Sequence, residues 1–478
     1  MTAESVNLKK ETFKAPASEW WQVIGFCLTL SLLGLRFYPI ALVCIVLLLM
    51  RWQRNRYFLL IEILILMGDF AFKANDVLPF KMSDISLVLG VVGFVIYRKN
   101  REVKYVTFAM LGYFAVLLLL ASTSLESMTV QFVMMRNYMI IIAFFIPLLL
   151  FANKNFDWDK FIHALVIHAL VICGFYVVDT FILGGYVLLP GSLAMSHKST
   201  IFSLRIFEYG MPRHYPYGLY WLVLCIIPIT YRWVRLSWIQ WVIILLSLLA
   251  SRTNTLLFAL VACYVLFRQD VRQVLKYGIL GVGLLIIGYF ADSATGGHLR
   301  LASNIDQFAS LSVAQDDEDL AEFGTGRMAQ ILPKWALLDE MERLDVGFGF
   351  LHPTLTTNPV FQIRNDYYSN EALANELATA VEVTQVQTIL DCGYIGLLAQ
   401  FAFYIGIYFI IRRLKYAKFY LCAFVGVSIL GIGGFAGVTQ RDGLLIVALA
   451  LAAVFLANKP RRDEYEEPKV ELLNSNAS

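Results

Sequence analysis

Arginines that stand apart from the basic loops of this chain are its residues best suited to bind a ligand. A guanidinium group donates paired hydrogen bonds to phosphate oxygens, which makes arginine the side chain of choice for phosphate recognition. Together these arginines predict a cationic chamber, for which a lipid with a pyrophosphate headgroup is a natural occupant. Anion transport and ordinary snorkelling at a membrane surface are the competing explanations. The arginines are Arg136, Arg205, Arg213, Arg252, Arg327 and Arg441.

The histidines, cysteines and acidic residues, which could bind a metal or undergo redox chemistry, form no recognisable site. His163 and His168 lie five residues apart in one apolar segment, about 140° round a helical wheel, and are interpreted as packed or headgroup-facing residues. Four other histidines are scattered without metal-ligand spacing, and the seven cysteines include no CxxC pair. The acidic run 316–319 could bind a divalent cation, but we interpret it as a solvated loop. The sequence predicts no metal and no cofactor.

The elements that must position these residues are membrane helices. The chain has 478 residues, of which 59% are hydrophobic and 16% charged, and its mean hydropathy is +0.65. Soluble proteins have about 45–50% apolar and about 25% charged residues. The excess excludes a soluble enzyme, a secreted module and a nucleic-acid binder, and the net charge of +3 implies no polyanionic partner.

The apolar runs predict an all-α polytopic membrane protein with 12–14 transmembrane helices. A span needs about 20 residues, and fewer where the flanking residues snorkel. The candidate spans are approximately 20–36, 38–51, 57–72, 83–98, 104–121, 137–152, 161–183, 215–231, 236–250, 253–267, 272–290, 388–411, 417–434 and 440–457.

The basic residues orient this predicted bundle. They gather in short loops on one side, which the positive-inside rule assigns to the cytoplasm together with both termini. These loops are 51–56, 98–104, 232–235, 268–272, 412–415 and 459–462. The predicted organisation is a cytoplasmic segment 1–19, a bundle 20–290 with eleven spans, a large extracytoplasmic loop 291–386, C-terminal helices 387–458 and a cytoplasmic tail 459–478.

Motifs on the extracytoplasmic side carry a family resemblance. Ser251-Arg252-Thr253 opens an apolar helix, and the large loop contains Gly324-Thr-Gly-Arg327, then Trp335 and Gly347-Phe-Gly349. The next span begins within Glu382-Val-Thr-Gln-Val-Gln-Thr-Ile-Leu-Asp391-Cys-Gly393-Tyr-Ile-Gly396. This set, over about residues 200–410, resembles the O-antigen ligase/polymerase superfamily of bacterial envelope glycosyltransferases, which have a GT-C-like membrane fold. The upstream stretch from Arg205 to Arg213 also resembles the family's outer loop.

The last motif departs from the ligase branch of that family. The branch has a histidine eleven residues before the first glycine of the closing pair, where this chain has Glu382, and Asp391 stands where the family has glutamate. The related shape–elongation–division glycan polymerases have an aspartate at the equivalent spacing. The resemblance therefore favours a polymerase over a ligase.

The resemblance implies transfer of a glycan, with inversion, from an undecaprenyl pyrophosphate carrier to a sugar hydroxyl in the bacterial inner membrane. The hydroxyl needs a general base, which contributes about 10²–10⁴-fold, and Glu382 is our candidate, with Glu371 and Glu376 as substitutes. Fixed cations can stabilise the departing pyrophosphate. The candidate donor-binding residues are Arg205, Arg213, Arg252 and Arg327. The implied partners are the lipid-linked donor, a glycan acceptor, membrane lipids and a chain-length regulator protein, but no nucleic acid.

Two alternatives remain open at this point. A ligase would attach the finished glycan to lipid A–core or to a protein. A transporter or flippase for a lipid-linked sugar would need ionisable groups near the bilayer midplane, and Glu62, Asp69 and Asp179 are the few candidates. Lid aromatics could stack on sugar rings or rest on lipid; they are Trp335, Phe348, Phe350, Tyr367 and Tyr368. Gly393 and Gly396 are interpreted as close-packing positions between helices.

Overall fold

The computed structural model describes most of the apolar part of the chain. Its described residues are 12–34, 39–40, 43–44, 55–67, 82–97, 100–124, 126–152, 154–182, 221–230, 233–251, 259–265, 279, 283, 286–291, 293–294, 331, 334–351, 381, 383–432 and 441–458. Helices dominate these residues, and the β-pairing within them is one isolated bridge between Thr12 and Arg235. The all-α prediction is confirmed for this part of the chain.

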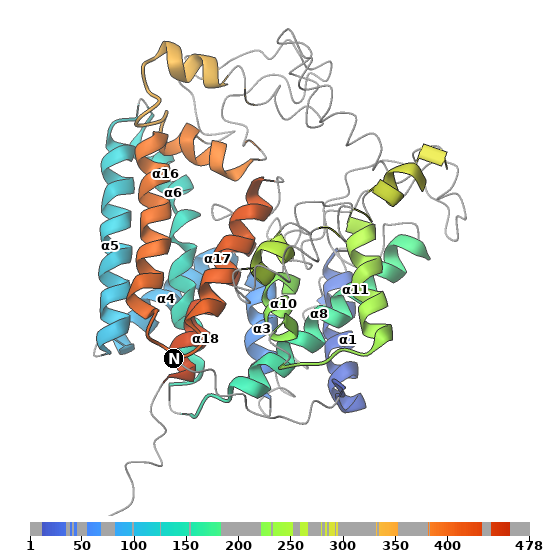
Figure 1. The fold of residues 1–478 in the computed structure, drawn as a ribbon. Helices are drawn as coiled ribbons and strands as arrows, with labels where there is room; N and C mark the ends of the chain where they lie inside the picture. Colours follow the sequence, from blue (N-terminus) through green and yellow to red (C-terminus); the bar gives the residue numbers. More distant parts are fainter. Residues whose placement is uncertain are drawn as a thin grey trace, which may run out of the picture.

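Figure 1 shows the described helices in chain order, coloured from blue at the N-terminus to red at the C-terminus. Their bounds are α1 Ala17–Gly34, α3 Arg56–Met67, α4 Met82–Tyr97, α5 Arg101–Ser122, α6 Met128–Met135, the 3-10 helix η2 Tyr138–Phe144, α7 Phe145–Leu150, α8 Trp158–Phe181, α10 Trp221–Thr230, α11 Trp238–Ser251, α16 Thr384–Ile411, α17 Ala417–Ile432 and α18 Arg441–Ala457.

Several of these helices could span a membrane. Within the described residues, three are long and apolar enough, namely Arg101–Ser122, Trp158–Asp179 and Thr384–Ile411. The pair Met128–Met135 and Tyr138–Leu150, bent by 41°, would add a fourth. Shorter apolar helices accompany them, including Ala417–Ile432 and Gly443–Ala457. The membrane character predicted from composition is therefore supported.

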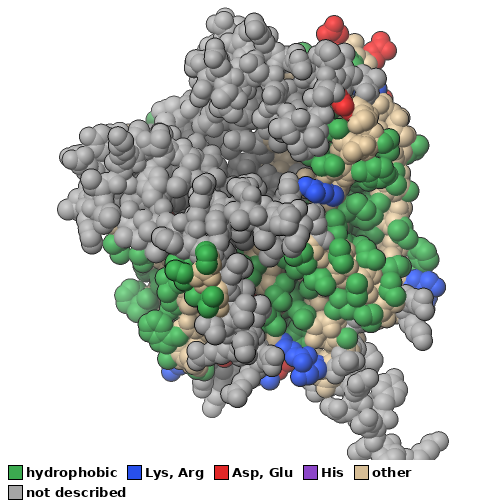
Figure 2. Space-filling model, turned by 180° about the vertical axis from the view of Figure 1, so that it is seen from behind, with side chains coloured by type: hydrophobic (Ala, Val, Ile, Leu, Met, Phe, Trp, Pro, Cys, Tyr) green, Lys and Arg blue, Asp and Glu red, His purple; other side chains and the backbone are tan. Residues whose placement is uncertain are grey.

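Large apolar side chains on the outer helices are exposed in the described part of the chain. Leu119 of α5 is 67% exposed and Leu398 of α16 is 68% exposed. Hydrophobic side chains cover much of the described part of the face in Figure 2. Apolar surface of this extent is typical of proteins that lie in lipid.

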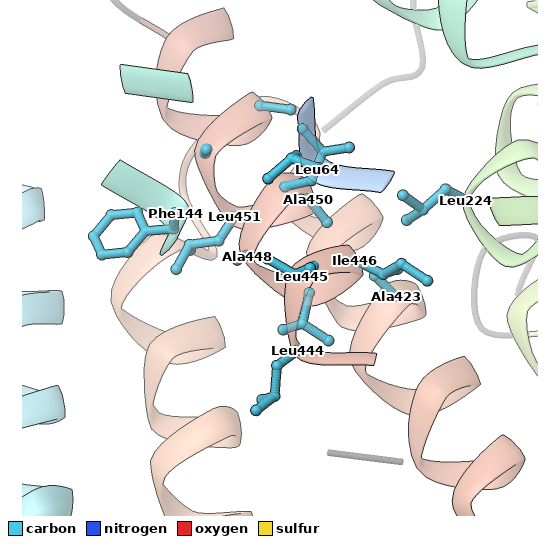
Figure 3. Close-up of a cluster of buried hydrophobic side chains, with 14 of the residues drawn as sticks. Leu64, Phe144, Leu224, Ala423, Leu444, Leu445, Ile446, Ala448, Ala450 and Leu451 are labelled. Carbon is cyan, nitrogen blue, oxygen red and sulfur yellow. The ribbon is translucent and has the colours of Figure 1, made fainter. Parts of the chain in front are cut away.

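Helix α18 forms the centre of the packing. Every residue from Leu444 to Val454 is at most 1% exposed, and a helix that is apolar all round is a buried helix. Its neighbours are η2, α7, α10 and α17. Figure 3 shows Phe144 of η2, Leu224 of α10 and Ala423 of α17 around it.

Three aromatic side chains join loops at one end of the bundle. Trp158 stacks on Tyr416 with ring centroids 3.9 Å apart, and Trp233 meets both rings edge-on at 5.9 and 5.3 Å. Trp158 begins α8, Tyr416 precedes α17 and Trp233 lies between α10 and α11. Two of these positions adjoin loops that the sequence predicts to be basic and cytoplasmic, so the cluster fixes the helix ends there.

Candidate active site

The five site residues predicted from the sequence lie outside the described residues. They are Glu382, Arg205, Arg213, Arg252 and Arg327. Two other arginines of the predicted chamber can be placed in the chain. Arg136 lies in the turn between α6 and η2, two residues before Tyr138, and Arg441 begins α18. Most of the predicted large loop, 291–386, is also outside the described part, but residues 334–351 belong to it.

Helix α16 is broken at Gly393, within the motif that carries the resemblance. Gly393 has φ 65° and ψ −173°, so the helical path stops there and resumes at the next residue. These angles are accessible almost only to glycine. In Figure 1 the segment before the break turns away from the long segment that follows it. The break frees backbone N–H and C=O groups that an intact helix would pair internally.

A loop over residues 343–351, which we call the docking loop, satisfies those freed groups. The Tyr394 and Ile395 N–H groups donate to Leu344 O at 2.9 Å and to Asp345 O at 3.1 Å. In return, the loop donates two backbone N–H groups to the segment before the break. Phe348 donates to Leu390 O at 2.7 Å and Gly349 to Asp391 O at 3.0 Å. Two motifs far apart in the sequence thus join through four backbone hydrogen bonds.

Three glycines make this close approach possible. A Cβ on Gly347 would lie 2.6 Å from the Asp391 carbonyl carbon, and one on Gly393 would collide with the Asp345 carbonyl. Gly349 has no room for a Cβ because the Ser124 side chain occupies that position. Gly393 therefore serves a contact between backbones and not the helix–helix packing expected for it. A Cβ on Gly396 would collide with Cys392 of the same helix at 2.0 Å and would also lie 3.4 Å from Leu120 of α5.

Polar side chains from α6 and from the connection before it hold the other edge of the docking loop. Gln131 bonds Phe350 twice, accepting from its N–H at 2.7 Å and donating to its carbonyl at 3.2 Å. Ser124 donates to Phe348 O at 2.8 Å. Arg343, within the loop, donates to Gly347 O and to Thr123 O, both at 2.7 Å. The loop is thus pinned between α5 and α16.

A carboxylate stands at the centre of this arrangement. Asp391 is only 8% exposed. The Tyr138 hydroxyl donates to its Oδ2 at 2.9 Å, and Gln387 Nε2 donates to its Oδ1 at 2.7 Å. Gln387 also accepts from the Val381 N–H at 2.7 Å, which ties the residue before Glu382 to the Asp391 carboxylate. Both carboxylate oxygens therefore have partners, as a buried carboxylate requires.

Lys334 adds a cation from the large loop to this cluster. It is 8% exposed, and burial lowers the pKa of its ammonium from an ordinary 10.5 to about 8, while the Asp391 carboxylate acts in the opposite direction. No pattern in the sequence pointed to Lys334, Tyr138 or Gln387 as site residues. Asp391 was indicated only by its position in the closing motif.

The aromatic residues suggested for sugar stacking divide into three groups. Phe348 and Phe350 are each 1% exposed, so they pack inside the protein and cannot face a sugar or a lipid. Trp335 is half-buried and meets Tyr394 edge-on, with ring centroids 6.2 Å apart. Tyr367 and Tyr368 lie outside the described residues.

This arrangement could take part in acid–base or electrostatic chemistry. It combines a buried carboxylate, a phenol, an amide and a lysine with a lowered pKa, and such perturbed groups gather at functional sites. Within the part of the chain that the structure describes, no group of His, Cys, Asp and Glu could hold a metal ion.

Comparison of this chain with known proteins identifies no relative. No family model, no curated protein and no solved structure matches the chain. The described residues form a helical protein with several apolar helices that could span a membrane, and one of these candidate spans is broken at Gly393 and joined there to a loop.

Replacing Gly393 with alanine should undo the docking of residues 343–351. The alanine would have to adopt strained angles and its Cβ would collide with Asp345, so we expect a loss of about 1–3 kcal/mol and faster proteolysis of the loop. Gly406→Ala on the same helix is the control, because a Cβ there meets open space. Equal unfolding midpoints and cleavage rates for the two variants would contradict this account.

The lowered pKa of Lys334 predicts a pH-dependent stability. Between about pH 8 and pH 10.5 the folded protein has released this proton while the unfolded chain still holds it. Stability relative to Lys334→Met should therefore rise across that window, by at most about 2 kcal/mol from pH 8 to about 9.5. Thermal unfolding of both proteins over this pH range is the measurement, and parallel curves would refute the assignment.

Proposed function

We propose that this protein is an inverting, metal-independent glycosyltransferase. It polymerises oligosaccharide repeat units carried on undecaprenyl pyrophosphate at the periplasmic face of a bacterial inner membrane, giving O-antigen, capsule or exopolysaccharide. The observation that carries the proposal is the Asp391 cluster at the break in α16. There the Gly-x-Gly and closing motifs, on which the family resemblance rests, bond to each other through their backbones.

The proposed base is Glu382. Its neighbour Val381 donates to Gln387, whose amide donates in turn to Asp391. This chain of hydrogen bonds gives Asp391 a positioning role: its two oxygens are occupied, so it holds the segment that carries Glu382. A base placed beside the acceptor hydroxyl would take its proton as the new glycosidic bond forms.

The proposed donor site uses the arginines of the predicted chamber. Arg205, Arg213, Arg252 and Arg327 would share the pyrophosphate and stabilise the charge that grows as it leaves. The donor is already activated by its pyrophosphate, so the reaction requires neither a nucleotide sugar nor a metal ion. Lys334 adds positive charge to the neighbouring cluster.

The proposal includes the topology predicted from the sequence. Twelve to fourteen spans, with the large loop between the eleventh and twelfth, place the docking loop and the break in α16 on the periplasmic side. Both termini are then cytoplasmic. The aromatic cluster of Trp158, Trp233 and Tyr416 would mark the cytoplasmic ends of the helices, which fits the enrichment of aromatic residues at membrane interfaces.

The lipopolysaccharide or polysaccharide pattern of a deletion strain tests this function. A polymerase deletion should leave single repeats on the outer-core lipid and no long chains. Loss of long chains from lipid A, with free polymer still on its carrier, would identify a ligase instead. Repeat units that accumulate on the cytoplasmic leaflet would identify a flippase.

Complementation with Glu382→Gln tests the proposed base. We expect polymer yield to fall by about 10²–10⁴-fold, with normal protein level and normal unfolding midpoint, because the amide cannot accept the hydroxyl proton. Glu340→Gln, which changes an exposed carboxylate of the same predicted loop, is the matched control and should retain polymer. Unchanged chain length and yield with Glu382→Gln would show that the base lies elsewhere.

A further inference from the structure

A second buried carboxylate lies far from the docking loop, between α3 and α8. Glu62 Oε1 lies 3.0 Å from His168 Nε2, and both side chains are 0% exposed. His168 is the eleventh of the 24 residues of α8, so it lies near the middle of a candidate span. Ionisable residues at this depth are rare in membrane proteins, and they mark ion or proton sites by default.

The hydrogen bonds of the histidine ring define how many protons the pair holds. His168 Nδ1 lies 2.7 Å from the Ala164 carbonyl oxygen, which can only accept, so Nδ1 carries a hydrogen. The contact between Nε2 and Glu62 Oε1 then needs one further proton, because two bare acceptors would repel. That proton lies either on the carboxyl or on the ring.

The surroundings favour the neutral arrangement, in which Glu62 is the acid and donates to His168 Nε2. Within the described part of the chain, Glu62 Oε2 has no hydrogen-bond partner. Phe58 and Phe26 lie against the imidazole, with ring centroids 5.2 and 6.5 Å away. A separated ion pair with one bare carboxylate oxygen would be costly in such apolar surroundings.

Among the described residues, no other charged group interacts with Glu62 or His168. Cys27 of α1 lies near Glu62 and is a neutral thiol donor at most. Cys225 of α10 donates to Leu165 O, about one turn along α8. The described side chains of α7 and α11 include no titratable group.

We propose that Glu62 and His168 form a proton-binding site in the middle of the membrane, which holds one transferable proton between the carboxyl and the imidazole. The step is a transfer along one hydrogen bond: when the proton moves from Oε1 to Nε2, the carboxyl becomes a carboxylate and the ring an imidazolium. The site is independent of the proposed glycosyl transfer, and it gives the chain a group able to respond to a proton gradient.

A second histidine–carboxylate pair on the same helix provides the comparison. His163 Nε2 lies 2.8 Å from Glu19 Oε2 of α1, and both side chains are partly exposed, at 30% and 25%. His163 precedes His168 by five residues, or about 7.5 Å along the helix axis. Glu19→Gln therefore changes the same kind of pair in a wet environment and serves as the matched control.

Infrared spectra of the full-length protein in lipid nanodiscs at neutral pH test the site. We expect a carboxylic-acid C=O band that shifts in D₂O, is lost in Glu62→Gln and is retained in Glu19→Gln. A wild-type spectrum that loses no such band on Glu62→Gln would mean that Glu62 is ionised, and would overturn the proposal.

Unfolding midpoints provide a second, independent measurement. The glutamine amide can still donate to His168 Nε2, so Glu62→Gln should fold and should lower the midpoint much less than Glu62→Ala. An ion pair predicts similar losses for the two variants, since either would leave a buried imidazolium without its partner. A Glu62→Gln protein that fails to fold, or is as unstable as Glu62→Ala, therefore also overturns the proposal.

Discussion

The structure around the candidate active site depends on one requirement, that backbone N–H and C=O groups freed inside or beside a membrane must find partners. Non-helical backbone at that depth is tolerated only where protein or a water-filled cavity receives it. Gly393 breaks α16, and the docking loop meets the need with four backbone hydrogen bonds. The glycines at 347, 349 and 393 are present because any Cβ would hold the two backbones apart.

The same break gives the site its chemistry. The first segment of α16 ends beside the docking loop, and Asp391 there lies between Tyr138, Gln387 and Lys334. Broken helices serve binding sites in other membrane proteins for this reason. The proposed polymerase would use the feature to place the Glu382 segment and the arginine chamber at one membrane face. The Glu62–His168 pair occupies a separate place in the bundle, buried between α3 and α8.

Composition predicted the helical membrane fold, because every span must consist mostly of apolar residues, and long apolar runs can be read directly from a sequence. The helical wheel also separated His163 from His168, whose Nε2 atoms pair with a carboxylate of α1 and of α3 respectively. The motif spacing brought attention to Gly347, Gly349 and Gly393, but their role depends on φ angles and on a partner distant in the chain, which no local pattern encodes. Phe348 was misjudged as a possible sugar or lipid contact because burial inside a folded loop depends on that same docking. Glu382 and the four donor-site arginines stay predictions.

Hydrogen exchange at the Tyr394 and Ile395 amides tests the central claim most directly. These two N–H groups donate across the break to Leu344 O and Asp345 O of the docking loop. In nanodiscs, we expect strong protection of both amides in the wild-type protein, and loss of that protection when Gly347→Val keeps the docking loop away. Rapid exchange at these amides in the wild-type protein would contradict the claim, as would protection that survives the Gly347→Val change.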